Sequence, residues 1–117
     1  MAERQVTLPN EPDQAVDRLQ TLSAERPVLV FKKSPICPVS FAAEEAFDSY
    51  LGELRDDDPL AVARIDVIEE RPLARGLTSE LGIKHESPQA LYFDQGKLVW
   101  HGSHADLNLK RFRKLRK

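Results

Sequence analysis

The chain of 117 residues contains one cysteine, Cys37, which stands between two prolines in the stretch FKKSPICPVS, residues 31 to 40. With no second cysteine, this residue is either buried and inert, a ligand shared with another molecule, or a reactive thiol that pairs with a sulfur outside the chain. Its position after an apolar run and at the start of a helical pattern is typical of reactive thiols. We therefore predict that Cys37 is a nucleophile.

The residues after Cys37 predict how its thiolate is stabilised. If Cys37 caps a helix, Pro38 occupies the first helical position, and the free amides of Val39 and Ser40 point towards the sulfur. The partial positive charge of a helix N-terminus also favours the thiolate, the form that attacks a disulfide. The Ser40 hydroxyl could hydrogen-bond to the thiolate, or it could simply support the first turn. Since a hydroxyl forms no disulfide, the motif C-P-V-S predicts thiol-disulfide exchange that uses one cysteine only.

Two lysines, Lys32 and Lys33, stand just ahead of this motif. A lysine here could place a positive charge near the thiolate or meet the carboxylates of an anionic thiol. Side chains alternate along a strand, so only one of the two faces Cys37. We assign Lys32 to stabilising the thiolate and Lys33 to substrate binding. The alternative is that both are solvated charges at the end of a strand.

Hydrophobic patterns predict the elements that position the motif. The apolar run PVLVFK, residues 27–32, is typical of a strand covered on both faces. Apolar residues at helical spacing after Cys37 predict a helix that begins at or close to it. The other predicted elements are a helix in residues 12–24, a strand in 60–67, a helix ending near Gly82, a hairpin in 87–102 with Gly96 in its turn, and a closing helix from about Asp106.

This order of elements predicts an α/β fold in one domain, residues 1–117. Two parallel strands joined by a crossover helix, then an antiparallel hairpin and a terminal helix, describe a four-stranded mixed sheet flanked by helices on both faces. No repeat, linker or low-complexity segment divides the chain.

The second half of the chain resembles thioredoxin. The segments ARIDV and LGI, followed by PQALYFDQGKLV, match the part of thioredoxin in which a proline is held cis beside the redox centre. Pro88 matches that proline. A cis bond at this point exposes the backbone groups before it to an extended substrate, so the resemblance implies that Ser87 and Pro88 bind substrate, with His85 close to the same groove.

A closer resemblance covers roughly residues 25 to 107. FKKSPICPVS, ARIDVIEERPL and LGIKHESPQALYFDQGKLVWHGSH together resemble the monothiol bacilliredoxins, thioredoxin-fold proteins linked to the low-molecular-weight thiol bacillithiol. The resemblance implies a thioredoxin-like fold, bacillithiol as thiol co-substrate, and bacillithiolated client proteins as partners. It also implies that Cys37 removes bacillithiol from protein mixed disulfides.

Composition argues against several other classes of protein. The net charge is −2 and the pI is near 5.9, so no overall attraction to nucleic acid or to acidic membranes is expected. The basic C-terminal stretch KRFRKLRK complements the negative end of a last helix. The N-terminus lacks the apolar core of a signal peptide, and no segment could span a bilayer, so we expect a cytoplasmic protein. His85, His101 and His104 lack the regular spacing of metal ligands, and no metal is expected.

Two other functions remain open at this point. One cysteine per subunit holds an iron–sulfur cluster in monothiol glutaredoxins, although Pro38 and Val39 replace the glycine and phenylalanine of their C-G-F-S motif. Alternatively, a non-catalytic thioredoxin-like adaptor could bind extended peptides at the edge near Pro88. An adaptor would keep its partners after Cys37→Ala, whereas an oxidoreductase would lose all thiol-disulfide exchange.

Overall fold

The computed structural model describes residues 3–116, which form one four-stranded sheet with helices on both faces. The strands lie in the order β2-β1-β3-β4, and β1 pairs in parallel with β2 and antiparallel with β3. β3 and β4 form the predicted hairpin. The strands are β1 (Val28–Lys33), β2 (Ala61–Asp66), β3 (Gln89–Asp94) and β4 (Lys97–Ser103). The predicted α/β class and mixed sheet are confirmed.

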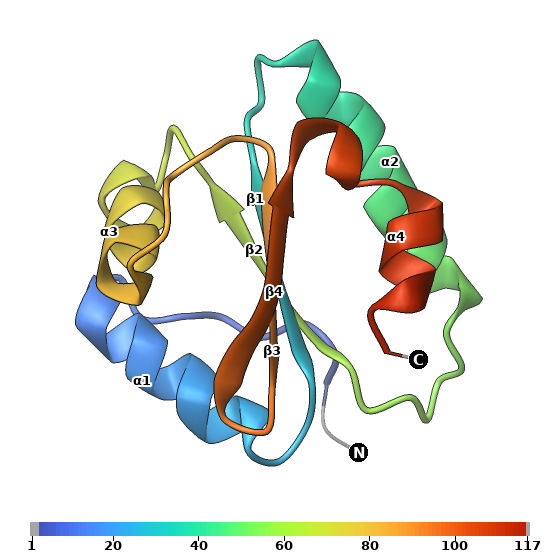
Figure 1. Cartoon of the computed structure of the whole chain (residues 1–117), viewed down its shortest axis with the longest axis horizontal. Coiled ribbons are helices and arrows are strands. Elements are labelled where there is room, and N and C mark those ends of the chain that lie inside the picture. The colour runs from blue at the N-terminus through green and yellow to red at the C-terminus, as the bar shows by residue number, and fades with distance from the viewer. Residues whose placement is uncertain (1–2, 117) are drawn as a thin grey trace.

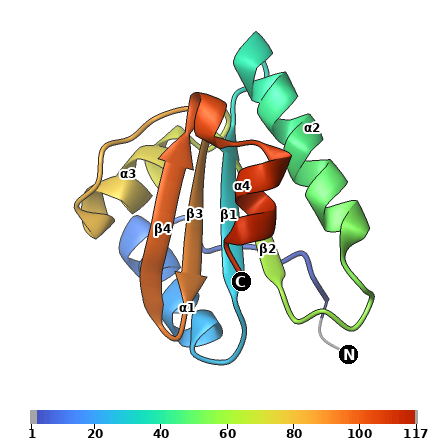
Figure 2. The ribbon, with the colours of Figure 1, turned by 45° about the vertical axis from the view of Figure 1, so that its right-hand side comes forward.

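In the described residues, four α-helices cover the sheet in two pairs. Figure 1 shows α1 and α3 on one face and α2 and α4 on the other, and Figure 2 shows the second pair lying together. The helices are α1 (Pro12–Ser23), α2 (Pro38–Glu53), α3 (Arg71–Leu81) and α4 (Leu109–Lys114). Within the described residues, no helix combines the length and the apolar character that a membrane crossing requires.

The central strand β1 explains why its sequence is a continuous apolar run. Val28 and Val30 pack into the core beneath α1 and α3, whereas Leu29 and Phe31 pack into the core beneath α2 and α4. On the second face, the Phe31 and Phe47 rings stack with their centroids 4.8 Å apart. Both faces of β1 are covered by helices. Side chains that alternate along the strand therefore all enter a core, whichever face they point to.

The closing helix differs from the prediction in its start. Instead of one helix from about Asp106, a short 3₁₀ turn, η1 (His104–Asp106), precedes α4. The Asn108 side chain accepts a hydrogen bond of 2.9 Å from the amide of Arg111. This is an N-cap, and it fixes the start of α4 at Leu109.

Candidate functional site

Four segments meet at one end of the sheet, the upper end in Figure 1. β1 runs parallel to β2 and antiparallel to β3, and β4 returns antiparallel to β3. The segment after β1, which carries Cys37, therefore lies at the same end as the segment before β3, which carries Pro88. The segments after β2 and after β4 complete this end of the molecule.

Cys37 is the N-cap residue of α2. Its backbone is extended, with φ −99° and ψ 121°, and Pro38 begins the helix, as predicted. The side chain is partly exposed. Within residues 3–116 no hydrogen bond reaches the Cys37 sulfur, so the thiol is open to a partner from outside the chain.

Ser40 holds the cysteine-bearing segment against the first turn of α2. Its hydroxyl accepts a hydrogen bond of 2.9 Å from the amide of Ser34, and its side chain is 2% exposed. Its own amide donates to the Cys37 carbonyl oxygen at 3.0 Å, so the prediction that this amide is free to face the sulfur is wrong. The amide of Val39 has no acceptor among the described residues. A direct contact between the Ser40 hydroxyl and a thiolate stays a prediction.

The two lysines point to opposite faces of the sheet. Lys33 lies on the side of α2, and its amine is 3.3 Å from a carboxylate oxygen of Glu44. The same carboxylate is 3.4 Å from Arg64 of β2. Lys33 is therefore partly neutralised, on the face that α2 covers, by its ion pair with Glu44. Its role in binding stays a prediction.

Lys32 points to the face covered by α1 and α3 and is fully buried. Its amine lies 2.7 Å from Oε1 of Gln89 and 2.7 Å from Nδ1 of His85. The pKa of Lys32 is lowered from 10.5 to about 7, mainly by burial and also by the charge of Arg75, while the charge of Glu86 acts in the opposite direction. These contacts join Lys32 to the segment before β3. The predicted thiolate-stabilising role of Lys32 stays untested by them.

The segment before β3 contains the predicted cis proline. The Ser87–Pro88 bond is cis, and the Pro88 side chain is buried. The Pro88 carbonyl oxygen accepts a hydrogen bond of 3.2 Å from the amide of His104 in η1. The Ser87 hydroxyl is buried and has no hydrogen-bond partner among the described residues. It is thus a buried polar group at this end of the sheet whose hydrogen-bonding capacity is unused among the described residues.

His85 is half-buried, and its Nδ1 faces the amine of Lys32. Burial lowers the pKa of its imidazole, and the charges of Lys32 and Arg75 act in the same direction. A backbone hydrogen bond at Ala74 of α3 opposes the shift. A neutral imidazole whose Nδ1 accepts from Lys32 fits these surroundings. The predicted substrate contact of His85 stays a prediction.

Three exposed apolar residues lie within four positions of Cys37 in the chain, and the sequence analysis did not single them out as a group. Ile36 is 78% exposed, Val39 47% and Phe41 58%. Exposed apolar residues gathered near one point indicate a contact surface for another molecule. The sequence held a usable signal, because Phe41 falls outside the buried helical stripe that contains Ala43 and Phe47.

Most of the chain matches the model of a known protein family. The model of the family described as monothiol bacilliredoxin BrxC matches residues 10–112, a span that includes Cys37 and Pro88. The chain belongs to the monothiol bacilliredoxin family. The family resemblance stated from the sequence is thereby confirmed.

Several solved structures share the fold of this chain. One described as a candidate oxidoreductase with a thioredoxin fold shares 31% identity, with 97% of this chain and 95% of that chain covered and a TM-score of 0.76. Desulfothioredoxin from Desulfovibrio vulgaris Hildenborough shares 21% identity over 84% and 86% of the two chains, with a TM-score of 0.61. Fasciola hepatica thioredoxin shares 15% identity over 96% and 94%, with a TM-score of 0.65. Family and fold together support a thiol redox function.

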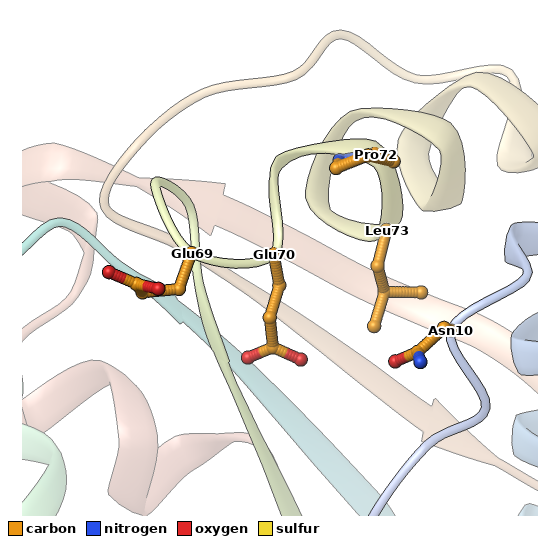
Figure 3. A pocket seen from close by; sticks show the side chains of 5 residues that line it. All are labelled: Asn10, Glu69, Glu70, Pro72 and Leu73. Carbon is orange, nitrogen blue, oxygen red and sulfur yellow. The ribbon is translucent and has the colours of Figure 1, made fainter.

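A pocket of about 250 Å³ lies near the same end of this bacilliredoxin, between the start of α1 and the start of α3. Figure 3 shows Asn10, Glu70 and Leu73 among the side chains that line it. Neither Cys37 nor Pro88 contributes to its lining. Because it carries the carboxylates of Glu69 and Glu70, the pocket disfavours an anionic ligand.

Metal ligands are not gathered in the described part of the bacilliredoxin. Residues 3–116 contain no group of three or more His, Cys, Asp or Glu side chains that could hold a metal ion. His101 and His104 are both exposed.

Proposed function

We propose that this protein is a monothiol thiol-disulfide oxidoreductase that removes bacillithiol from protein mixed disulfides. The observation that carries the proposal is the position of its one thiol, partly exposed at the N-terminus of α2 and at the end of the sheet where Pro88 also lies. Membership of the monothiol bacilliredoxin family supports bacillithiol as the small thiol.

In the proposed reaction, the Cys37 thiolate attacks the bacillithiol sulfur of the mixed disulfide. A new bond forms between the two sulfurs, the bond between bacillithiol and the client cysteine breaks, and the client thiolate leaves and takes up a proton. The number of disulfides is unchanged. A second thiol, free or enzymatic, then attacks the bacillithiolated Cys37 and regenerates it. We propose that this cycle contributes to thiol redox homeostasis in the cytoplasm, where cellular reductants supply that thiol.

The residues around Cys37 support this reaction in different ways. Pro38 starts the helix without needing a hydrogen-bond acceptor, and we propose that the Val39 amide, which has no acceptor among the described residues, stabilises the thiolate. Ser40 holds the cysteine-bearing segment through the hydrogen bond from the Ser34 amide, and as a serine it cannot form a disulfide with Cys37. We propose Ser87 and Pro88 as substrate-binding residues that act through the backbone before β3, and Lys33 as a charge that attracts an anionic thiol.

The exposed apolar residues suit a protein substrate. Ile36 and Phe41 offer exposed apolar surface before and after Cys37 in the chain, which a small polar disulfide would not need. Client proteins carrying bacillithiol are therefore the proposed partners.

The test is to incubate the protein with bacillithiol disulfide and, separately, with glutathione disulfide. Because Cys37 is the only cysteine, the mass of the intact chain reports its adduct without ambiguity. We expect faster adduct formation with bacillithiol disulfide and release of a bacillithiolated client protein. Cys37→Ser should lower the release rate to the uncatalysed background, because no nucleophile remains.

Ser49→Ala, an exposed substitution in α2, serves as the folded control and should leave release unchanged. Equal and slow reaction with every disulfide, at the rate of a small unactivated thiol, would contradict the proposed function.

A further inference from the structure

The buried lysine Lys32 has no part in the reaction just described. Its side chain is fully buried, and its amine donates to Gln89 Oε1 and bonds to His85 Nδ1, each at 2.7 Å. A buried amine is tolerated only where its hydrogen bonds are made. The two acceptors are therefore the structural reason that a lysine can occupy this position.

Gln89 carries the contact onward to the backbone of residues 84–88. Lys32 and Gln89 are direct partners across β1 and β3, so their side chains lie on the same face of the sheet. The Gln89 side-chain amide donates to the Lys84 carbonyl oxygen at 2.9 Å. Its Oε1 also accepts from the Glu86 amide at 3.3 Å. With His85, the pair holds three consecutive residues of this segment.

The other side of the segment is held separately. The Ser103 hydroxyl donates to the Glu86 carboxylate, and the His104 amide donates to the Pro88 carbonyl oxygen. Ser87 lies between these two sets of contacts with its hydroxyl unpartnered. Of the two sets, only the contacts from Lys32 and Gln89 come from buried side chains of the sheet.

We propose that the Lys32–Gln89 pair positions residues 84–88 for substrate binding, and that Lys32 is a positioning residue that touches neither Cys37 nor the substrate. This inference rests on the proposed function, since it assumes that Ser87 and Pro88 contact the disulfide. It differs from the role assigned to Lys32 from the sequence, in which its charge acts on the thiolate. Lys32 lies on the face of α1 and α3, whereas α2 covers the other face.

The test compares Lys32→Met, which keeps an unbranched side chain one atom shorter and removes its donors, with Lys97→Met. Lys97 is an exposed lysine at the start of β4 and serves as the matched control. Hydrogen exchange of the Glu86 amide is read by NMR, with the Val67 amide, which donates to the Lys33 carbonyl oxygen at 2.9 Å, as internal reference. We expect Glu86 exchange to accelerate about tenfold in Lys32→Met only.

Kinetics separate positioning from a direct action on the thiolate. In Lys32→Met, we expect the KM for a bacillithiolated protein to rise about tenfold, with kcat changed less than about twofold. The rate of Cys37 alkylation by iodoacetamide, which needs no contact with residues 84–88, should stay unchanged. Unchanged Glu86 exchange, or a fall in alkylation that parallels the fall in disulfide exchange, would overturn the inference.

A second variant covers the case in which Lys32→Met does not fold. Gln89→Glu keeps an acceptor for Lys32 but removes the donor to the Lys84 carbonyl oxygen, and we expect it to accelerate exchange in residues 84–87 as well. A lack of disulfide exchange in the unmodified protein would overturn the proposed function alone. The Glu86 amide, measured without any disulfide, would then still show whether the pair holds the segment.

Discussion

Ser40 holds Cys37 relative to α2 through two hydrogen bonds, one accepted by its hydroxyl and one donated by its amide. The Ser34 amide donates to the Ser40 hydroxyl, and the Ser40 amide donates to the Cys37 carbonyl oxygen. Both involve the backbone of the cysteine-bearing segment, so main-chain geometry sets the direction of the Cys37 Cα–Cβ bond. The serine that replaces a second cysteine in the motif therefore has a structural role that is independent of any contact with sulfur.

The buried amine of Lys32 makes the free energy of unfolding depend on pH. Its pKa is about 7 in the folded protein and 10.5 in the unfolded chain, so between these values the unfolded chain binds more protons. Stability should therefore rise with pH from about 7 towards 10.5, by up to about 1.4 kcal/mol per pH unit from this group. Urea unfolding at several pH values between about 7.5 and 9.5 measures the slope.

Lys32→Met should remove this contribution to the slope, and the exposed Lys97→Met should keep it. A slope that is the same in both variants would show that Lys32 does not lose its proton in the folded protein over this range.

Among the elements, helix α3 matters for the site because it leads into residues 84–88. The helix ends at Gly82, which has φ 72° and lies in the left-handed region. The Gly82 amide donates to Ser79 at 3.2 Å and the Ile83 amide donates to Thr78 at 3.0 Å. Glycine adopts this conformation without steric cost, which is why it is favoured at the end of a helix.

Gly82→Ala should destabilise the protein by about 1 kcal/mol, because alanine is strained at a positive φ. A methyl group at this position would meet no atom within 4 Å, so the loss comes from backbone conformation alone. The matched control is Gly52→Ala in α2, where a methyl group also meets nothing within 4 Å. That substitution should be neutral or stabilising by up to about 1 kcal/mol.

Chemical unfolding of the two variants gives both values. Two changes of the same sign and size would show that the left-handed conformation of Gly82 does not limit the choice of residue there.

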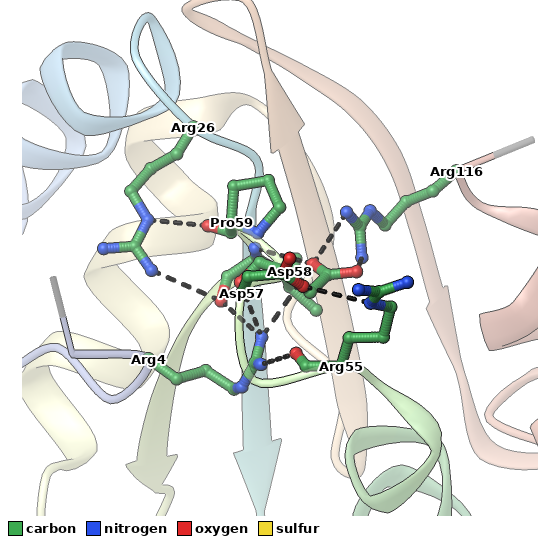
Figure 4. A network of polar contacts seen from close by, with 8 residues as sticks. Arg4, Arg26, Arg55, Asp57, Asp58, Pro59 and Arg116 are labelled. Carbon is green, nitrogen blue, oxygen red and sulfur yellow. Dashed lines mark hydrogen bonds and ion pairs between the residues drawn. The ribbon is translucent and has the colours of Figure 1, made fainter. Parts of the chain in front are cut away.

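At the scale of the whole molecule, one acidic residue joins both chain ends to the core. Asp58, just before β2, binds Arg116 through two contacts of 2.8 and 3.0 Å and lies 3.9 Å from Arg4. Figure 4 shows these arginines converging on Asp58 from segments far apart in the sequence. The cluster lies near the start of β2, at the opposite end of the sheet from Cys37, so it contributes to stability and not to the reaction.

Burial alone would raise the pKa of Asp58. The hydrogen bond from Arg116, the backbone hydrogen bond at Leu60 and the charges of Arg116 and Arg4 outweigh burial and lower it. A lowered pKa means that the ionised carboxylate stabilises the folded state at every pH above its ordinary value of 3.8. This stabilisation is lost as the pH falls through the lower pKa of the folded protein.

Asp58→Asn should therefore cost about 1 kcal/mol at neutral pH, a value reduced for the solvent that reaches this partly exposed pair. Asparagine keeps an acceptor for the Leu60 amide, so the substitution tests the charge. The difference from the unmodified protein should shrink below about pH 4.

Asp57→Asn is the control, because Asp57 is 69% exposed and pairs only with the exposed Arg55 among the described residues. Unfolding in urea at pH 7 and at pH 3 measures both variants. A cost for Asp58→Asn that persists unchanged at low pH would contradict the electrostatic account.

The sequence by itself determined the parts of this protein that depend on neighbouring residues. The apolar run of β1, the proline that opens α2 after Cys37 and the glycine that ends α3 are short-range signals, and each predicted its element. The four-stranded mixed sheet followed from the order of these elements, since connection rules leave few arrangements. The resemblance to thioredoxin added the cis proline before β3.

Tertiary structure alone decided which groups meet across the sheet. The sequence showed that only one of Lys32 and Lys33 could face the cysteine, but it did not show that Lys32 would meet His85 and Gln89 across more than 50 residues of chain. Such a contact depends on strand register and on the depth of the core, and no local pattern encodes either. The burial that lowers the pKa of Lys32 is therefore a property of the folded molecule, as is the meeting of Arg4 and Arg116 at Asp58.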